Sequence, residues 1–323
     1  MSSQSMAEGP AATPPSVFIM GAGVVGTALA ARLVRAGVPV VGLHGRQVEL
    51  TDAARASSGV AGVVGSTGEV PEILSEADAV IISVRDDRIP DVAARLVSEG
   101  RLRPAQVLLH TSGANPARTI LAMAVPHVRA VGTLHPLVSF SDARLSVEGL
   151  GEVAFGIEGD EPARAVASSI VRALGAHAVT LEAENLALYH AGAVIASNYV
   201  VAMVDTARSL LIKAGVPAEQ ALPVLIPLLS SVVQNLSQVG LPGALTGPVE
   251  RGDVTVVEGH LGALAAHAPE LVELYRLVGR EVLGLARQKG RMDPANAARL
   301  EALLSGAGPA APAGGNGGPS AGS

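Results

Sequence analysis

The stretch that decides the fold is VFIMGAGVVGTALAARLVRAGVPVVGLHGRQ, residues 17–47. An apolar β-branched run is followed by Gly21, Gly23 and Gly26 in the spacing G-x-G-x-x-G, then by a helical pattern and a second apolar run. Gly21 permits a tight turn, Gly23 lets the backbone approach a pyrophosphate, and Gly26 lets the helix pack on the strand. The pattern therefore predicts a dinucleotide-binding turn whose helix N-terminus faces the phosphates. The alternative is an ordinary glycine-rich turn between a strand and a helix.

The residues that follow the second strand indicate which dinucleotide is bound. NAD enzymes carry Asp or Glu there for the ribose hydroxyls, whereas this chain has His44, Gly45 and Arg46. A guanidinium matches a 2′-phosphate that a carboxylate would repel, so we expect NADP rather than NAD. Arg46 could instead be a solvated surface arginine, and His44 a secondary contact or filler. The predicted cofactor-binding residues are Gly21, Ala22, Gly23, Val24, Val25, Gly26, Arg46 and Val84.

The organisation of the chain follows from its length and from the spacing of its apolar residues. A chain of 323 residues favours two domains. Short β-branched runs alternate with helical stretches over residues 16–181, which predicts an α/β domain with a doubly wound parallel sheet of the Rossmann type. Residues 182–304 have helical spacing only, which predicts an all-α C-terminal domain. Residues 1–15 and 305–323 are rich in Gly, Pro, Ala and Ser, which predicts disorder.

Composition excludes several classes of function. The net charge is −6 and the basic residues are scattered, so we expect no nucleic-acid partner. Cysteine is absent, and no close cluster of His, Asp and Glu suggests a metal site. Prolines and amides interrupt the longest uncharged run, residues 220–249, so we expect no membrane span. The N-terminus lacks the pattern of a secretory signal, which makes a cytoplasmic location the expectation.

Ligands of a doubly wound sheet bind beyond the carboxyl ends of its strands, so polar residues in those loops are candidates for the site. In HTSGA (110–114), the hydroxyl of Ser112 could orient a substrate oxygen or a catalytic histidine, or simply form a local turn. In GTLHPLVSF (132–140), His135 could supply a proton or a strong hydrogen bond to a developing alkoxide, or simply bond to local backbone. In SVRDDRIP (83–90), we expect the backbone to pass the cofactor ribose, and Asp86 or Asp87 is interpreted as a helix N-cap.

The helix NLALYHAGAVIASNYVVAMV, residues 185–204, is apolar but carries three polar side chains of interest. At about 100° per residue, His190 and Ser197 share a face and Asn198 lies at its edge. Polar groups in a core need partners, so they either contact a substrate or form hydrogen bonds across the helix packing. Further on, LTGPVERGD (245–253) offers Thr246 and Arg251 to a substrate, with Arg251 able to clamp a carboxylate. Asp253 is interpreted as a helix cap.

These motifs together resemble a known superfamily. The order of fingerprint, strand-end loops and helical domain is similar to that of the 6-phosphogluconate, prephenate, ketopantoate and pyrroline-carboxylate dehydrogenases or reductases. More closely, HTSGA, GTLHPLVSF, YHAGAVIASNYVVAM and LTGPVERGD resemble a branch that joins a Rossmann-like domain to its own C-terminal helical domain, over about residues 16–304. Some members of that branch are linked to pantothenate biosynthesis as alternative ketopantoate reductases.

The resemblance implies roles for individual residues. The His-Pro loop is similar to that of prephenate dehydrogenases, whose histidine contacts substrate, which favours His135. The reductases commonly aim a Lys-x-x-x-Asn pair at the substrate; Asn198 matches the Asn, but Val194 stands in place of the Lys. The proton donor is therefore either His190 or His135.

The function expected from the sequence is an NADP-dependent oxidoreductase that reduces a small 2-oxo acid, with ketopantoate as the named candidate. Its partners would be a small carboxylate substrate and a second copy of the chain in a homodimer. One alternative is an imine reductase resembling pyrroline-5-carboxylate reductase. The other is an NADP(H)-binding sensor that does not turn over.

Overall fold

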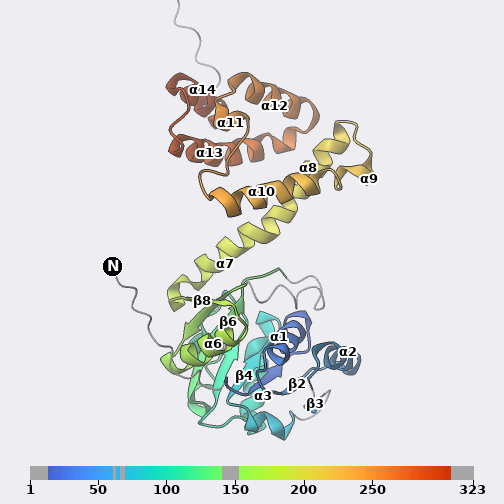
Figure 1. Ribbon diagram of the computed structural model, residues 1–323, viewed down its shortest axis with the longest axis vertical. Helices are drawn as coiled ribbons and strands as arrows, with labels where there is room; N and C mark the ends of the chain where they lie inside the picture. Colours follow the sequence, from blue (N-terminus) through green and yellow to red (C-terminus); the bar gives the residue numbers. More distant parts are fainter. Residues whose placement is uncertain (1–13, 61–62, 66–69, 140–152, 307–323) are drawn as a thin grey trace, which may run out of the picture. The chain divides into compact units, whose positions relative to one another are not determined.

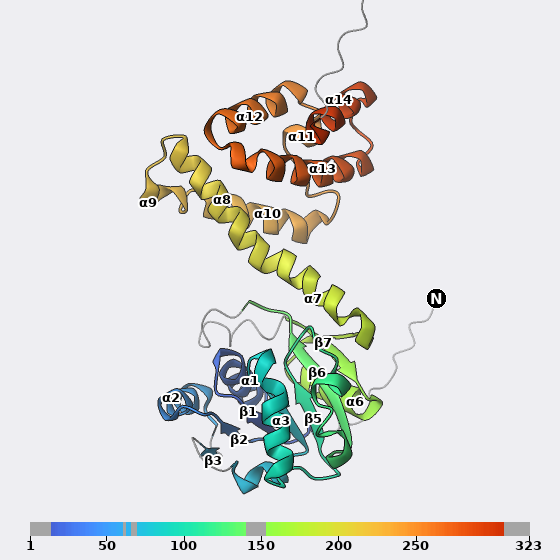
Figure 2. The ribbon, with the colours of Figure 1, turned by 180° about the vertical axis from the view of Figure 1, so that it is seen from behind.

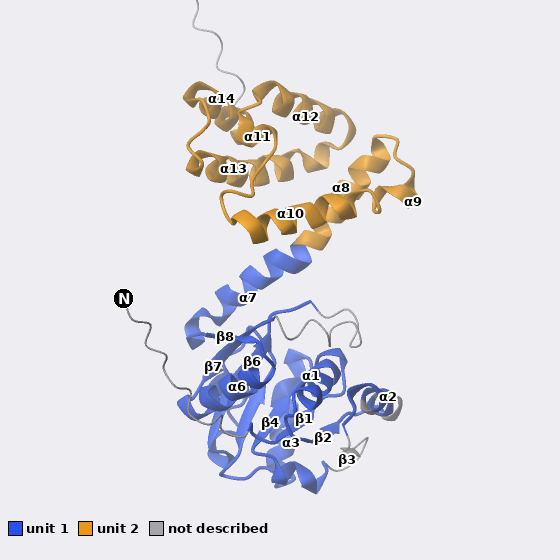
Figure 3. Cartoon of the chain, in the orientation of Figure 1, with its two compact units in different colours: residues 1–199 blue, residues 200–323 orange. Residues whose placement is uncertain are grey.

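The computed structural model describes residues 14–60, 63–65, 70–139 and 153–306. Nearly all of the two terminal segments predicted to be disordered lies outside these ranges. The chain divides into two compact units, residues 1–199 and 200–323 (Figure 3). Each unit is described by itself.

The first unit is built on a mixed sheet. Its strands, eight in the described ranges, follow the order β3-β2-β1-β4-β5-β6-β7-β8 (Figure 1). They are β1 Val17–Met20, β2 Val40–His44, β3 Val63–Gly65, β4 Ala79–Ile82, β5 Val107–His110, β6 Ala130–Pro136, β7 Ala154–Gly159 and β8 His177–Thr180. Neighbouring strands are parallel except β6 and β7, which are antiparallel. The Rossmann-type fold is confirmed, but the expectation of a purely parallel sheet is wrong at this one pair, a common addition to parallel sheets.

Both faces of the sheet are covered, because side chains alternate along each strand. Val17 and Ile19 of β1 pack with α1 (Val24–Arg35), α2 (Val48–Ser58) and α6 (Glu161–Ala173). Phe18 and Met20 pack on the other face with η1 (Glu72–Glu76), α3 (Ile89–Ser98) and α4 (Ala117–Ile120). Figure 2 shows α3 running along this second face. The result is a three-layer arrangement, in which the four residues of the edge strand β8 are exposed.

The strand order places a topological switch at β1, which lies between β2 and β4. The chain leaves β1 for a helix on one face and leaves β4 for a helix on the other, so a crevice opens beyond their carboxyl ends. The glycine-rich turn, residues 21–26, lies at this crevice.

The first unit ends in a helix. The last strand ends at Thr180, next to the predicted domain boundary after Leu181. The chain continues through η4 (Ala183–Asn185), α7 (Leu186–Val194) and a π-helical turn at Ile195–Tyr199. The compact units divide after Tyr199, so α7 and the π-helical turn group with the sheet.

The second unit is helical throughout its described residues, 200–306. Val249, Val257, Leu283, Leu300 and Leu304 form its buried core. Its longer helices are α8 Val200–Lys213, α10 Leu225–Val239, α12 Val254–His267, α13 Val272–Gln288 and α14 Pro294–Ser305, with short α9 Ala218–Ala221, α11 Pro248–Arg251 and η6 Pro269–Leu271.

Candidate active site

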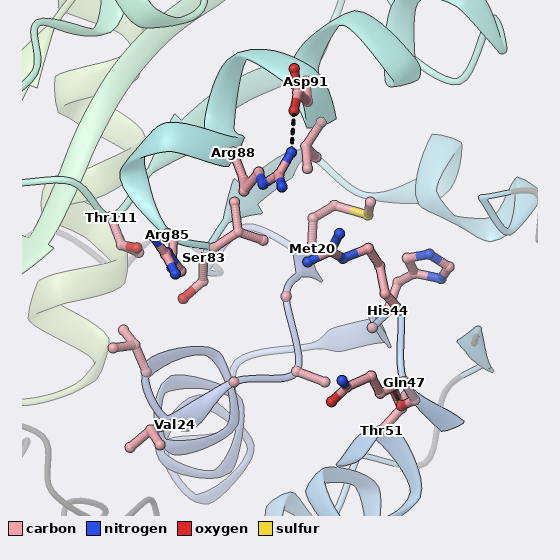
Figure 4. A pocket seen from close by; sticks show the side chains of 18 of the residues that line it. Met20, Val24, His44, Gln47, Thr51, Ser83, Arg85, Arg88, Asp91 and Thr111 are labelled. Carbon is pink, nitrogen blue, oxygen red and sulfur yellow. Dashed lines mark hydrogen bonds and ion pairs between the residues drawn. The ribbon is translucent and has the colours of Figure 1, made fainter. Parts of the chain in front are cut away.

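A pocket of about 650 Å³ lies beyond the carboxyl ends of β1, β2 and β4 (Figure 4). Figure 4 shows Ser83, Arg85 and Thr111 on one side and His44 on the other. Of the predicted cofactor-binding residues, all but Gly26 line this pocket: Gly21, Ala22, Gly23, Val24, Val25, Arg46 and Val84. The crevice at the topological switch thus brings together three segments that are distant in sequence.

The three fingerprint glycines are required for different reasons. Gly21 has φ +126°, and a Cβ there would overlap the carbonyl oxygen of Ser83. A Cβ on Gly26 would overlap the carbonyl oxygen of Gly21. A Cβ on Gly23, in contrast, would meet no atom of the protein within 4 Å, and Gly23 has φ −78°, which any residue can adopt. The fold therefore explains Gly21 and Gly26 but leaves Gly23 to be explained by something that occupies the pocket.

Four arginines line the pocket. Of these four, Arg46 alone has a guanidinium with no partner in the described part of the chain. Arg85 pairs with Asp87 at 3.2 Å. Arg88 pairs with Asp91 at 3.1 Å, and Arg95 pairs with Glu99 at 2.6 Å. Arg46 is exposed at the pocket rim, where a bound anion would meet a cation that no carboxylate already neutralises.

Two buried polar side chains in the pocket lack partners among the described residues. The side chain of His44 is 3% exposed, and neither of its ring nitrogens has a hydrogen bond. The hydroxyl of Ser83, a residue 6% exposed, is also unpaired. Burial, and secondarily the charge of Arg95, lowers the pKa of His44, so the ring is neutral and can both donate and accept. Since buried polar groups are nearly always paired, these atoms point to a polar ligand.

A second cluster of polar residues lies at the carboxyl end of β5. The hydroxyl of Ser112 donates to Asp86 Oδ2 at 2.6 Å, and Asn115 Nδ2 donates to the same oxygen at 3.1 Å. The interpretation of Asp86 and Asp87 as helix caps is wrong, because neither η2 (Asp86–Arg88) nor α3 has a side-chain cap. Asp86 instead holds the loop that carries Ser112, and Asp87 pairs with arginines.

His135, Tyr189 and His190 meet beside this loop. His135 Nδ1 lies 3.1 Å from the hydroxyl of Tyr189, and the two rings meet edge to face. The ring of His190 is 5.9 Å from that of His135, and its buried Nδ1 has no partner among the described residues. Burial first, and the charge of His190 second, lower the pKa of His135 to about 4, against a smaller opposing effect of Asp86. His135 is therefore neutral at pH 7.

A buried hydrogen-bond chain supports the Ser112 loop from below. His110 Nδ1 accepts the backbone N–H of Ser112 at 3.1 Å, so its Nε2 carries the hydrogen and donates to Thr133 Oγ1 at 3.1 Å. Thr133 donates in turn to Glu158 Oε2 at 3.0 Å, which also accepts the N–H of Ala117. Burial lowers the pKa of His110 to about 3, so the imidazole of His110 is neutral throughout the physiological pH range.

The other predicted site residues make local contacts. Ser197 donates to the carbonyl of Ala193 at 2.7 Å, and its oxygen lies 3.0 Å from Asn198 Oδ1. The π-helical turn also means that the seven-residue interval from His190 to Ser197 is not two regular α turns.

Two candidates lie in the second unit, Thr246 and Arg251. Thr246 lines an apolar cavity of about 400 Å³ within that unit. Arg251 donates to Asp253 Oδ2 at 3.0 Å. Asp253 is the N-cap residue of α12, as predicted, but its side chain accepts no hydrogen bond from the backbone of that helix. The predicted capping contact is therefore wrong. Among the described residues no group of three His, Asp or Glu side chains could hold a metal ion.

Two family descriptions match the chain. "Rossmann-like domain" matches residues 5–136, and a domain of unknown function, DUF2520, matches residues 153–282. The two matches follow one another along the chain. No curated protein matches the sequence. The DUF2520 match begins within the sheet, before β7, so the cluster takes His135 from the Rossmann-like segment and Tyr189 and His190 from the DUF2520 segment.

Several solved structures are similar to the chain over most of its length. A proposed NADP oxidoreductase from Bacteroides fragilis is 25% identical, with a TM-score of 0.64 over 84% of this chain and 98% of that one. A protein from Thermotoga maritima is 22% identical, with a TM-score of 0.66 over 85% and 100%. Pyrroline carboxylate reductase from Plasmodium falciparum, solved with NADP bound, is 13% identical, with a TM-score of 0.54 over 90% and 99%. The last two likenesses concern the fold alone.

Several residues of the pocket and of the cluster around His135 are not predicted from the sequence. Tyr189 lies in an apolar helical pattern that hides it, although it is one of only three tyrosines in the chain and directly precedes His190. His110 ends β5 and Ser83 directly follows β4, positions that mark both as candidates. The role of Asp86 has no local signal, because its partners lie 26 and 29 residues away.

Proposed function

We propose that this protein is an NADP(H)-dependent reductase of a small 2-oxo acid, with ketopantoate as the first substrate to test. The observation that carries the proposal is the pocket at the topological switch. The space beside Gly23 is empty there, and the guanidinium of Arg46 has no partner in the described chain. His44 and Ser83 are buried in the same pocket, also without partners among the described residues. These features fit a dinucleotide with a 2′-phosphate at Arg46. The NADP oxidoreductase of Bacteroides fragilis and the NADP-bound reductase of Plasmodium falciparum support the same cofactor.

The cluster beyond β5 and β6 fits the reaction. Reduction adds a hydride to the carbonyl carbon and a proton to its oxygen, which yields a 2-hydroxy acid. NADPH, when bound, supplies the hydride. His135 or His190 provides the hydrogen bond and proton for the oxygen, and Ser112 and Asn198 orient the substrate. Ser197 is a further proposed substrate contact, whereas Thr246 and Arg251, both in the second unit, stay predictions from the sequence.

An imine reductase is a second candidate, favoured by the neutrality of His135. A ketone needs a proton as it is reduced, whereas an iminium ion arrives already protonated and needs no strong acid. With its pKa near 4, His135 carries no charge at pH 7. Solved structures with the same fold include pyrroline-5-carboxylate reductase from Coxiella burnetii and an imine reductase from Streptomyces aurantiacus.

The test is NADPH oxidation at pH 7 by the purified full chain with ketopantoate, run beside pyrroline-5-carboxylate. We expect turnover with ketopantoate that is lost in His135→Ala. Turnover with the imine alone would replace the first candidate by the second. Tight NADPH binding with no turnover of either substrate would refute both proposed reductase functions and would support an NADP(H)-binding sensor.

Cofactor preference is tested in Arg46→Ala, with Arg35→Ala as the matched control because Arg35 is exposed on α1 and does not line the pocket. Losing a charge-assisted contact to a phosphate should raise the KM for NADPH by roughly tenfold or more. The KM for NADH should stay unchanged, as should both values in the control. An equal loss for the two cofactors would contradict the role of Arg46.

We also propose that the protein is a homodimer through α8 and α10. Val201, Leu228, Val233 and Val239 are each at least 60% exposed, and every residue from 230 to 239 is exposed, so α10 is uncovered all round. An apolar helix in this state needs a covering partner. Residues 183–213 and 218–239 are long and apolar enough to cross a membrane. Six of the ten residues in SSVVQNLSQV (230–239) are Ser, Asn or Gln, which favours a protein interface over lipid.

The assembly is tested by sedimentation of the full chain and of Val233→Glu. We expect a dimer that dissociates in the variant. A monomer that partitions into lipid vesicles would overturn both the dimer and the predicted cytoplasmic location.

A further inference from the structure

We infer that Tyr189 holds His135 in the tautomer with its hydrogen on Nε2, and that Tyr189 is the source of the proton that His135 passes to the substrate oxygen. This inference rests on the proposed reductase and deepens it by assigning the proton donor. His135 would be the catalytic residue, and Tyr189 a positioning and relay residue that acts through it.

The strand pairing creates the place for this contact. His135 on β6 lies directly opposite Gly156 on the antiparallel strand β7, so the two residues share one face of the sheet. A Cβ on Gly156 would lie 2.7 Å from the hydroxyl oxygen of Tyr189 and 2.9 Å from the adjoining ring carbon. The missing side chain is therefore what allows the phenol of Tyr189 to lie over β7 and reach His135.

Hydrogen-bond accounting assigns the tautomer. A phenol has one hydrogen to donate and an oxygen that accepts. Burial raises the pKa of Tyr189, so the phenol keeps its hydrogen at pH 7. A phenol O–H is a stronger donor than the N–H of a neutral imidazole, and an imidazole nitrogen is a stronger acceptor than a phenol oxygen, so the phenol donates to the atom 3.1 Å away, His135 Nδ1. Since Nδ1 accepts, the single hydrogen of the neutral ring is on Nε2.

The surroundings keep the ring in that orientation. A Cβ on Gly113 would lie 2.7–2.8 Å from Cε1, Nδ1 and Nε2 of His135, so the ring lies directly against this glycine. Gly113 is held in turn by its neighbour Ser112, which bonds to Asp86 and to the buried His110. His190 lies 5.9 Å from His135, so two charged imidazoles would repel each other at this site.

The chemistry balances without an imidazolium. As the carbonyl oxygen becomes an alkoxide, the Nε2–H bond of His135 breaks and an O–H bond forms. Nδ1 takes the phenolic hydrogen of Tyr189 at the same time, which leaves a neutral ring in the other tautomer and a phenolate at Tyr189. An alkoxide is a stronger base than a phenolate, so the transfer is downhill. Water then returns a proton to Tyr189. Neutral imidazoles polarise carbonyls in this way where the site lowers their pKa.

The chain contains a matched control for this pair. In the second unit, His260 Nδ1 lies 2.8 Å from the hydroxyl of Tyr275, and the rings are 5.9 Å apart at 84°. For His135 and Tyr189 the corresponding values are 3.1 Å, 5.6 Å and 86°. Tyr275→Phe therefore removes a hydroxyl of the same geometry from a histidine outside the proposed site.

The experiment is nitrogen-15 NMR of the histidine side chains in the full chain at pH 7, with His135 assigned by its loss in His135→Gln. We expect Nδ1 unprotonated and Nε2 protonated in the natural sequence. In Tyr189→Phe the two nitrogens should move toward a mixture of tautomers, whereas Tyr275→Phe should leave His135 unchanged. Protonated Nδ1 in the natural sequence would overturn the inference, whatever the effect of Tyr189→Phe.

Kinetics supply the second readout. General acid groups contribute roughly 100-fold or more, so Tyr189→Phe should lower kcat for ketopantoate by that factor while the Kd for NADPH stays constant. A loss of less than about threefold would overturn the relay. If the expected tautomer is seen but no 2-oxo acid is reduced, the proposed function fails while the tautomer stands, so the two failures are distinguishable.

Discussion

Gly23→Ala separates a ligand-binding role of the glycine-rich turn from a structural one. Gly23 is the N-cap of α1, with φ −78° and ψ −174°, a conformation open to alanine. Its added Cβ would meet no atom of the protein within 4 Å. The substitution should therefore leave the fold intact and place a methyl group where the backbone must approach the pyrophosphate.

The magnitude follows from two opposing effects on stability. Alanine lowers the entropy of the unfolded chain, which stabilises by about 0.4–1 kcal/mol. It is a poorer N-cap than glycine, which costs about the same amount. We expect the free energy of unfolding to change by less than about 0.5 kcal/mol. The lost approach of the pyrophosphate should weaken NADPH binding by roughly 10- to 100-fold, or about 1.4–2.8 kcal/mol.

The assay pairs denaturant unfolding with fluorescence titration of NADPH, and Gly26→Ala is the control. A Cβ on Gly26 would overlap a backbone oxygen of the same turn, so that variant should lose about 3 kcal/mol or more of stability. The reasoning is refuted if Gly23→Ala binds NADPH as the natural sequence does. It is equally refuted if Gly23→Ala unfolds as easily as the control.

Two other predictions follow from the second cluster. Gly113→Ala places a Cβ 2.7–2.8 Å from three ring atoms of His135, so kcat should fall tenfold or more. NADPH titration should show unchanged affinity, and a normal kcat would contradict the contact. Burial lowers the pKa of His110 to about 3 and of His135 to about 4 from 6.5, so the unfolded chain binds protons that the folded one does not as pH falls below 6.5. As pH falls below 6.5, each histidine should then lower the free energy of unfolding by about 1.4 kcal/mol per pH unit. This loss ends when pH falls below the pKa of that histidine in the folded protein. Urea unfolding between pH 7 and 4.5 checks this, and a slope unchanged in His110→Gln would exclude that residue as a cause.

Most of the first unit could be predicted from the sequence because its signals are local. The β-branched runs that alternate with helical stretches over residues 16–181 contain strands, and the fingerprint glycines form the expected turn at the switch. Strand β8, HAVT, has four exposed residues and therefore carries no pattern of burial in its sequence. Arg46 and Val84 could be placed at the pocket because residues that follow strands in this fold reach the same crevice.

Interpretations of single polar side chains were less reliable because a side chain has many competing partners. Asp86 and Asp253 both stand near helix starts, which favours capping. In the folded chain Asp86 accepts from Ser112 and Asn115, and Asp253 accepts from Arg251. A charged or hydroxyl donor outcompetes the free N–H groups of a helix, and its presence depends on what the fold brings near.

The sequence by itself determined the order of strands and helices, the dinucleotide-type turn and the helical second unit, since each depends on periodicity or on the conformational freedom of glycine. Only the tertiary structure decided the partners in the site. Tyr189 meets His135 across 54 residues because β7 returns antiparallel beside β6 and places Gly156 under the phenol. Contacts of this kind leave no local pattern, because the free energy that forms them comes from packing distant segments together.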